Sequence, residues 1–217
     1  MSFEPMPLTP ELQAYLLEHS TPPDDVTADL IAETRTTMPR QASMQIGPEQ
    51  AAFMRMLTTV MGVRQAVEVG TFTGLSALSI ARGLADGGRI TCFDVSEEYT
   101  AVARRYWNRA GIEDRIELRI GPAAERLAEL PDEPYLDLVF IDADKESYPT
   151  YWNALVPRVR RNGVILVDNT LWSGEVVDRR SASGRVMADF NDMALADERV
   201  ELVILPLLDG LTLARKL

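Results

Sequence analysis

The residues Leu138-Val-Phe-Ile-Asp-Ala-Asp-Lys145 give the clearest indication of the fold. Their apolar run is typical of a buried parallel strand. Asp142, Asp144 and Lys145 follow that run with almost no spacer. In an open α/β sheet, ligands bind just beyond the carboxyl ends of the strands. The stretch therefore predicts a charged site at the edge of such a sheet.

A second buried run, residues 163–167, ends in the same way, with Asp168 and Asn169. If the two strands are neighbours, about 4.8 Å apart, Asp142 converges with Asp168 and Asn169 on one small volume. Two carboxylates and an amide oxygen are hard ligands that suit a divalent cation, with Mg²⁺ the first expectation and Mn²⁺ or Ca²⁺ the alternatives.

The remaining pattern alternates strands and helices, which predicts a doubly wound α/β fold with a mainly parallel sheet covered on both faces. Asp209-Gly210 is a hairpin signal that predicts one antiparallel pair at the end of the chain. We expect a single domain over residues 1–217 with an N-terminal helical extension over residues 1–40. The predicted strands are 66–69, 89–93, 116–120, 138–141, 163–167, 200–205 and 211–215.

Helices are predicted between these strands and before them. Thr9-Pro10-Glu11 opens the first helix with a cap residue and a proline at the first helical position. Phe53, Met56, Leu57, Val60 and Met61 form an amphipathic stripe on a helix from Pro48, and the stripe is predicted to face the core. The other helices are predicted over 24–38, 75–84, 97–110, 148–160 and 186–196, with a short one ending at residue 130.

The turn Gly70-Thr-Phe-Thr-Gly74 joins a strand to a helix, as at the start of a nucleotide-binding unit. It lacks the full glycine pattern of dinucleotide binders. Glu68 would repel a phosphate and suits a cationic ligand instead. Asp94 ends the next strand, close to the offset of about 20 residues at which an acid binds a ribose hydroxyl. The alternative is that Asp94 caps the helix that starts near Ser96.

Composition narrows the function classes. The 217 residues carry 22 Lys and Arg against 33 Asp and Glu, a net charge of −11. A field of that sign opposes binding to nucleic acid or anionic lipid. A single cysteine, Cys92, and a single histidine, His19, leave no disulfide, zinc cluster or histidine triad to expect. The first five residues lack the features of a signal peptide and no apolar run reaches membrane length, so a cytoplasmic protein is expected.

Four motifs together resemble the cation-dependent O-methyltransferases, the group of caffeoyl-CoA O-methyltransferase and its bacterial relatives, distantly similar to catechol O-methyltransferase. The resemblance extends over residues 40 to 217. The motifs are Glu-Val-Gly-Thr-Phe-Thr-Gly (68–74), Phe-Ile-Asp-Ala-Asp-Lys (140–145), Val-Asp-Asn-Thr-Leu-Trp (167–172) and Leu-Asp-Gly-Leu-Thr-Leu-Ala-Arg-Lys (208–216).

The resemblance implies a Rossmann-like class I methyltransferase fold with a seven-stranded sheet whose last strand is reversed, and a homodimer. It implies S-adenosyl-L-methionine as methyl donor and a small aromatic acceptor with two vicinal hydroxyls. By resemblance, a divalent cation is bound by Asp142, Asp168 and Asn169, and Lys145 with Asp142 is catalytic. The donor positions are Glu68, Gly70, Ser76, Asp94, Ala123, Asp142, Asp144 and Tyr151, and the substrate positions are Met44, Trp172 and Ser173.

Several alternatives stay open on the sequence. The chain could be a metal-independent methyltransferase in which Asp168 and Asn169 only cap a helix. It could be an NAD-dependent oxidoreductase on a similar sheet, or a protein that binds the donor without catalysis. Lys145 could be a surface lysine paired with Asp144. The arginines in the loop 174–185 could either favour an acidic acceptor or simply be solvated.

Overall fold

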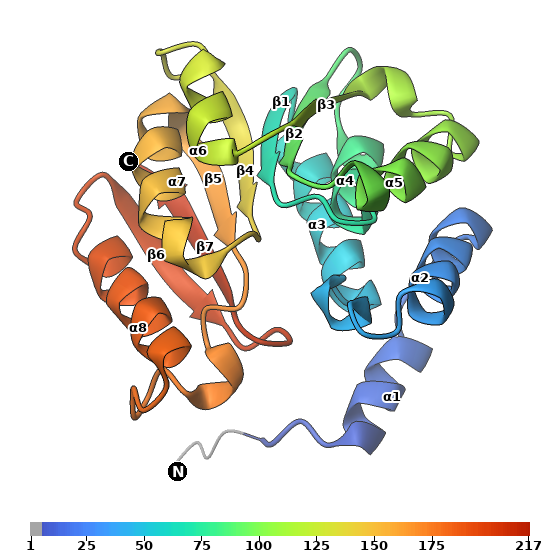
Figure 1. The fold of residues 1–217 in the computed structure, drawn as a ribbon, viewed down its shortest axis with the longest axis horizontal. Helices are drawn as coiled ribbons and strands as arrows, with labels where there is room; N and C mark the ends of the chain where they lie inside the picture. The colour runs from blue at the N-terminus through green and yellow to red at the C-terminus, as the bar shows by residue number, and fades with distance from the viewer. Residues whose placement is uncertain (1–5) are drawn as a thin grey trace.

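The computed structural model describes residues 6–217. The first five residues, for which no signal peptide is predicted, lie outside the described residues. A single seven-stranded sheet runs through the molecule in the order β3-β2-β1-β4-β5-β7-β6, as Figure 1 shows. Within the described residues, β7 is antiparallel to both of its neighbours, β5 and β6, whereas the other paired strands are parallel, which confirms the predicted sheet. The strands are β1 Gln65–Val69, β2 Arg89–Asp94, β3 Ile116–Ile120, β4 Leu136–Ile141, β5 Val159–Val167, β6 Val200–Leu205 and β7 Leu211–Lys216.

Helices cover both faces of this sheet (Figure 1). No helix within residues 6–217 has the length and apolar character that a bilayer crossing needs. The α-helices are α1 Pro10–Glu18, α2 Asp25–Thr37, α3 Pro48–Met61, α4 Leu75–Gly83, α5 Glu97–Arg109, α6 Ala123–Arg126, α7 Tyr148–Leu155 and α8 Ala182–Leu195. Short 3₁₀ turns lie at Ala42–Met44, Glu113–Arg115, Leu127–Glu129, Lys145–Ser147, Val156–Arg158 and Trp172–Gly174.

The central strand β4 is buried along its whole length, because both of its faces meet helices. Leu138 and Phe140 point into a core shared with helices α2 to α5. Val139 and Ile141 point into a second core shared with helices α6 to α8. This alternation follows from the two-residue period of a strand and explains why the sequence shows a continuous apolar run rather than an alternating one.

Strands β4 and β5 are parallel neighbours, which meets the condition for Asp142 and Asp168 to converge, and they end level with each other. Ile141 pairs with Val167 in the register. Beyond these ends, the Asp168 amide donates to the Ile141 carbonyl over 3.0 Å, and the Asp142 amide donates to the Val69 carbonyl over 2.8 Å. The two aspartates therefore leave the sheet at the same edge, next to the end of β1.

Helix α2 is fastened to the sheet domain, whereas α1 extends away from it (Figure 1). Leu30 and Ile31 of α2 are buried in the first core. Ion pairs join Asp24 to Arg82 and Glu33 to Arg105, linking α2 to helices α4 and α5. None of the residues of α1 is buried.

The stripe predicted on α3 does not form the buried face of that helix. Met56 and Val60 are exposed, at 63% and 83%. Phe53, Leu57 and Met61 are only partly buried, at the margin of the core. The face turned inward carries Gln50, Ala51, Met54 and Thr58 instead. Its two polar residues are accommodated because Thr58 donates to the Met54 carbonyl and Gln50 donates to a buried carboxylate.

Two predicted helix boundaries are also wrong. The helix from Tyr148 ends at Leu155 rather than near Arg160, and β5 begins already at Val159. Pro157 accounts for this, because it has no backbone N–H to continue the helical hydrogen bonds, and the 3₁₀ turn Val156–Arg158 follows the helix. Helix α8 starts at Ala182, about one turn earlier than expected, since the Ser181 hydroxyl accepts a hydrogen bond from the Gly184 amide and caps it.

Candidate functional site

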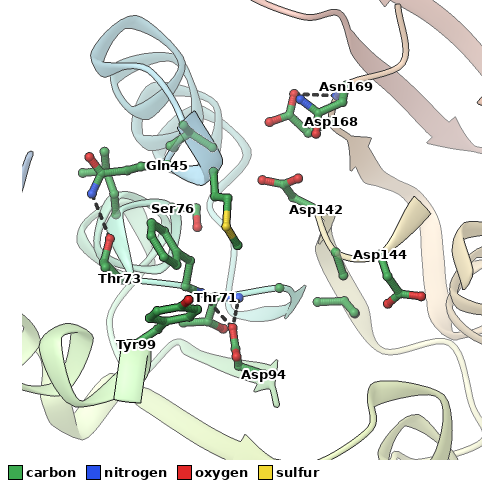
Figure 2. Close-up of a pocket in the computed structure, with 18 of the residues that line it drawn as sticks. Gln45, Thr71, Thr73, Ser76, Asp94, Tyr99, Asp142, Asp144, Asp168 and Asn169 are labelled. Atoms are coloured by element: carbon green, nitrogen blue, oxygen red, sulfur yellow. Dashed lines mark hydrogen bonds between the residues drawn. The ribbon is translucent and has the colours of Figure 1, made fainter. Parts of the chain in front are cut away.

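A cavity of about 800 Å³ opens at the carboxyl ends of β1, β2, β4 and β5, where a doubly wound fold binds its ligands. Its volume lies within the range of small-molecule sites. Most of the residues predicted from the sequence line this cavity: Met44, Gly70, Ser76, Asp94, Ala123, Asp142, Asp144, Lys145, Tyr151, Asp168, Asn169 and Trp172. In Figure 2, Asp94 and the glycine turn lie on one side, opposite Asp142, Asp168 and Asn169.

Asp94 holds the glycine turn in place. Its Oδ2 accepts hydrogen bonds from the amides of Thr71 and Phe72 over 2.9 and 2.8 Å, and its Oδ1 accepts from the Ser96 amide. The cap of α5 is the Ser96 side chain, which accepts from the Tyr99 amide. Asp94 is therefore not the cap of α5, and its side chain stands in the cavity wall beside the turn.

Gly70 lets the turn pack closely against the loop after β4. Its φ is +90°, and a Cβ at this position would meet the Asp142 carbonyl oxygen at 1.9 Å. Both observations require glycine here. The turn is thus fixed directly against the residue that carries the first predicted metal ligand, which links the two halves of the cavity.

The cavity wall contains two further pairs of polar or aromatic residues. The Tyr151 hydroxyl donates to Asp144 Oδ1 over 2.6 Å, and burial together with this carboxylate raises the pKa of Tyr151 to about 12. The side chain of Asp144 makes no cap to the following turn. Phe72 and Tyr99 pack edge to face at 5.0 Å between ring centroids, and both line the cavity.

Lys145 is held at the opposite wall between an acid and a phenol. Its Nζ lies 2.9 Å from Asp142 Oδ1 and 2.6 Å from the Tyr148 hydroxyl. Tyr148 is fully buried and its hydroxyl donates to the Asp168 carbonyl over 3.2 Å. Lys145 is therefore not a surface lysine paired with Asp144; it is oriented by Asp142 on one side and Tyr148 on the other.

Asp168 is a buried carboxylate with two protein donors. Its Oδ2 accepts from Gln50 Nε2 over 2.9 Å and its Oδ1 accepts from the Asn169 amide over 2.8 Å. Burial, and next the negative charge of Asp142, raise the pKa of Asp168 to about 7, although the two hydrogen bonds act in the opposite direction. A buried carboxylate beside another acid is costly unless a cation compensates it, so this pair fits a divalent ion.

The third ligand of such an ion would be an amide rather than an acid. Among residues 6–217, no three His, Cys, Asp or Glu side chains gather closely enough to hold a metal ion by themselves. Asn169 has a φ of +59°, a left-handed conformation that asparagine tolerates better than most residues. Asp142, Asp168 and Asn169 all line the cavity, and their oxygen donors suit a hard cation.

Two of the predicted site residues lie outside the cavity wall. Glu68 is fully buried beneath the glycine turn, near Ser76 and Thr71. Burial raises the pKa of Glu68 to about 8, so this side chain is protonated at neutral pH. Ser173 is exposed, and its amide donates to Asp209 Oδ1. Neither residue is part of the lining.

Several residues that line the cavity are not among those predicted from the sequence. Gln45 Nε2 donates to the hydroxyls of Thr34 and Thr73, which ties the segment before α3 to α2 and to the glycine turn (Figure 2). Gln50, on α3, reaches Asp168 across 118 positions of sequence. Leu208 and Asp209 belong to the β6–β7 turn and also line the cavity. No local pattern marks these residues; the hairpin signal at Asp209 predicts only the turn.

Solved structures of methyltransferases share this fold. An O-methyltransferase from Bacillus cereus, solved in complex with SAH, superimposes with a TM-score of 0.85 at 28% identity and covers 95% of this chain and 97% of that one. A methyltransferase from Podospora anserina, also SAH-bound, gives a TM-score of 0.88 at 26% identity over 99% of each chain. The fold is that of the class I methyltransferases.

Sequence comparison makes the assignment more specific. The model of a family described as O-methyltransferase matches residues 17–217. "Probable caffeoyl-CoA O-methyltransferase 2" of Dictyostelium discoideum is 38% identical over 94% of this chain and 90% of its own length. Caffeoyl-CoA O-methyltransferase 1 of Eucalyptus globulus is 34% identical over 80% and 75%. The chain belongs to this O-methyltransferase family and is an O-methyltransferase, which argues against the oxidoreductase alternative.

Proposed function

We propose that this enzyme transfers a methyl group from S-adenosylmethionine to one hydroxyl of a catechol-like aromatic small molecule, with a divalent cation held by Asp142, Asp168 and Asn169. The observation that carries the proposal is the buried Asp168 carboxylate beside Asp142, in the cavity that the methyltransferase fold uses. A cation bound there would lower the pKa of the acceptor hydroxyl and orient the vicinal diol.

The donor would occupy the half of the cavity around the glycine turn. S-adenosylmethionine carries a sulfonium cation, which suits a wall that contains Asp94 and Asp144. Gly70 packs the turn against the loop that carries Asp142, so the donor half adjoins the proposed cation site. Asp94 would bind the ribose hydroxyls, and Asp144 with Tyr151 would border the adenosine. Ser76 and Ala123 line the same region.

The residues of the opposite wall would position the acceptor and accept its proton. Lys145 Nζ lies at the carboxylate of Asp142. A divalent cation bound nearby would favour the neutral form of this amine, which can then take the proton of the acceptor hydroxyl as a general base. Tyr148 holds that amine from the other side. Met44 and Trp172 supply apolar walls for an aromatic ring. Most of the rate acceleration would come from holding the two reacting groups in line, an effect worth up to about 7–11 kcal/mol.

We also propose that the enzyme acts as a homodimer. Several of its exposed large apolar residues lie on two of the first three helices: Tyr15, Leu16 and Leu17 on α1, and Met56 and Val60 on α3. A second copy of the chain would cover them, since monomers rarely leave such residues clustered in water. The negative net charge supports a small-molecule partner rather than nucleic acid or a membrane.

The catechol requirement can be tested with a matched pair of acceptors. With S-adenosylmethionine and Mg²⁺, 4-methylcatechol should yield a mono-methyl ether detectable by mass spectrometry. 4-Methylphenol, which lacks the second hydroxyl, should yield none, because it cannot present a diol to the cation. Equal methylation of both compounds would contradict the proposal and favour a metal-independent methyltransferase.

A further inference from the structure

The charges around the cavity indicate which methyl acceptors the enzyme can bind. The names of the relatives do not answer this for the present chain. Five carboxylates line the cavity, and Lys145 is the single cation among the described residues that line it. Lys145 is itself paired with Asp142. A cleft lined by one sign of charge concentrates ligands of the other sign and repels ligands of its own.

Not all of these carboxylates face the acceptor. Under the proposed function, Asp142 and Asp168 hold the cation, and Asp94 and Asp144 stand in the donor half. Asp209 remains, beside Trp172, where its carboxylate accepts from the Ser173 amide and its carbonyl accepts from Leu171. No cation among the described residues forms an ion pair with it: Asp209 takes part in none of the salt bridges of residues 6–217.

The arginines nearest in sequence to this wall are occupied elsewhere. Arg179 pairs with Asp189 and Asp192 on α8. Arg180 pairs with Asp178. Arg185 donates to the carbonyls of Arg179 and Arg180. None of the three arginines lines the cavity, so the basic loop of the sequence supplies no binding site for an acidic acceptor there.

We infer that the acceptor of this enzyme is a neutral or cationic catechol, and that carboxylate-bearing catechols and polyanionic thioesters such as caffeoyl-CoA are poor acceptors. The inference rests on the proposed function and specifies its substrate class. The acceptor end of the cavity, with Asp209 and without a free cation, offers an anionic side arm no counter-ion. An uncharged or ammonium-bearing arm meets no such repulsion.

The test uses acceptors that differ in charge but hardly in shape or ring electronics. These are 3-(3,4-dihydroxyphenyl)propionate and its propionamide, with dopamine as the cationic member and caffeoyl-CoA as the polyanion. At low ionic strength, kcat/KM for the amide should exceed that for the carboxylate by about 2- to 30-fold. This is the range that Coulomb's law gives for one unit charge about 8 Å away, between the dielectric of water and that of a protein surface. The ratio should shrink in 0.5 M salt.

A charge introduced at the rim gives an independent test. Ser43 is exposed, lines the cavity and precedes Met44. Ser43→Lys should raise kcat/KM for the carboxylate relative to the amide by about threefold or more at low salt. Ser43→Gln, which adds a side chain of comparable reach without charge, should leave the ratio at its wild-type value.

The outcomes separate this inference from the proposed function. A carboxylate or caffeoyl-CoA turned over as well as the amide at low salt would overturn the inference, as would equal ratios for Ser43→Lys and Ser43→Gln. Absence of turnover with the amide would count against the proposed function instead. Calorimetric affinities of the amide and the carboxylate for the enzyme would then decide the charge inference, with stronger binding of the amide supporting it and equal binding overturning it.

Discussion

Gln50 Nε2 donates a hydrogen bond to Asp168 Oδ2 over 2.9 Å inside a fully buried contact between α3 and the loop after β5. The other polar side-chain atom of Gln50, Oε1, is buried and has no hydrogen-bond partner among residues 6–217. Gln50 thus fixes the orientation of a proposed metal ligand from a helix that contributes no ligand itself. Partners of this kind commonly set how well a metal site works.

Replacing Gln50 should therefore weaken cation binding. Gln50→Met keeps the length of the side chain but removes the donor, so the affinity for Mn²⁺ should fall by about 10- to 100-fold. Titration followed by electron paramagnetic resonance, without acceptor, measures this directly. Gln45→Leu is the matched control: Gln45 bonds to Thr34 and Thr73 instead, so its loss should leave Mn²⁺ affinity unchanged. Equal Mn²⁺ affinities for wild type and Gln50→Met would show that Gln50 does not support the site.

Lys145 should matter for turnover far more than for donor binding. Lys145→Met removes the amine that lies between Asp142 and Tyr148, and kcat should fall by roughly 100-fold or more if the amine takes the acceptor proton. Calorimetry should show the affinity for S-adenosylmethionine within about twofold of wild type, since removing a general base leaves the donor contacts in place.

A second substitution distinguishes the role of Lys145 as a proton acceptor from the role of its positive charge. Lys145→Arg keeps a cation beside Asp142, but a guanidinium does not accept a proton at accessible pH. This variant should be about as slow as Lys145→Met. A rate near wild type in Lys145→Arg would mean that the positive charge, rather than proton transfer, is what the reaction needs.

Gly70 should be intolerant of any side chain. Gly70→Ala places a Cβ at 1.9 Å from the Asp142 carbonyl oxygen at a φ of +90°, so backbone must move on both sides of the cavity. The free energy of unfolding should fall by on the order of 3 kcal/mol or more. Gly87→Ala is the control, because Gly87 also has a positive φ but nothing within 4 Å. Chemical denaturation should show the larger loss for Gly70→Ala, and equal losses would refute the close contact.

Glu68 should make stability fall as the pH rises. Burial raises its pKa from 4.5 to about 8 in the folded protein, so between these values the folded chain keeps a proton that the unfolded chain releases. The contribution of protonated Glu68 to the free energy of unfolding is fully present below pH 4.5 and is lost as the pH rises through about 8. The free energy of unfolding falls by up to about 1.4 kcal/mol per pH unit over this range. Glu68→Gln cannot titrate and removes this slope.

The comparison is made by denaturant unfolding of the wild type and Glu68→Gln at pH 5, 6.5 and 8 without added metal. Asp168 is present in both proteins, so its titration cancels in the difference. Relative to the variant, the wild type should lose on the order of a few kcal/mol between pH 5 and pH 8. Parallel pH profiles would show that Glu68 is already ionised in the folded state.

The sequence predicts the sheet and the ends of its strands well because those features are local. An apolar run followed by an acid, as at Ile141-Asp142 and Val167-Asp168, predicts both a buried strand and a site residue at its end. Parallel pairing of the two strands then brings the two acids together. The ends of the helices are harder to predict, because they depend on single residues such as Ser181 and Pro157. The effect of one such residue can override the periodic pattern of apolar residues.

Contacts made by helix α3 could not be predicted in the same way. Its apolar stripe suggested that Met56 and Val60 face the core, yet both are exposed and Gln50 faces inward. The inward position of Gln50 depends on Asp168, a partner far away in the sequence. Glu68 shows the converse case: its place in the strand was predicted, but only the structure shows that it lies beneath the glycine turn and outside the cavity wall.

The most direct test of the account is whether methyl transfer needs a divalent cation at Asp168. Formation of S-adenosylhomocysteine from S-adenosylmethionine and 4-methylcatechol would be measured with Mg²⁺ and with excess EDTA, in wild type and in Asp168→Ala. We predict activity that EDTA abolishes and Mg²⁺ restores in the wild type. Asp168→Ala should stay inactive while still binding S-adenosylmethionine. Turnover that ignores EDTA, or that survives in Asp168→Ala, would contradict the account.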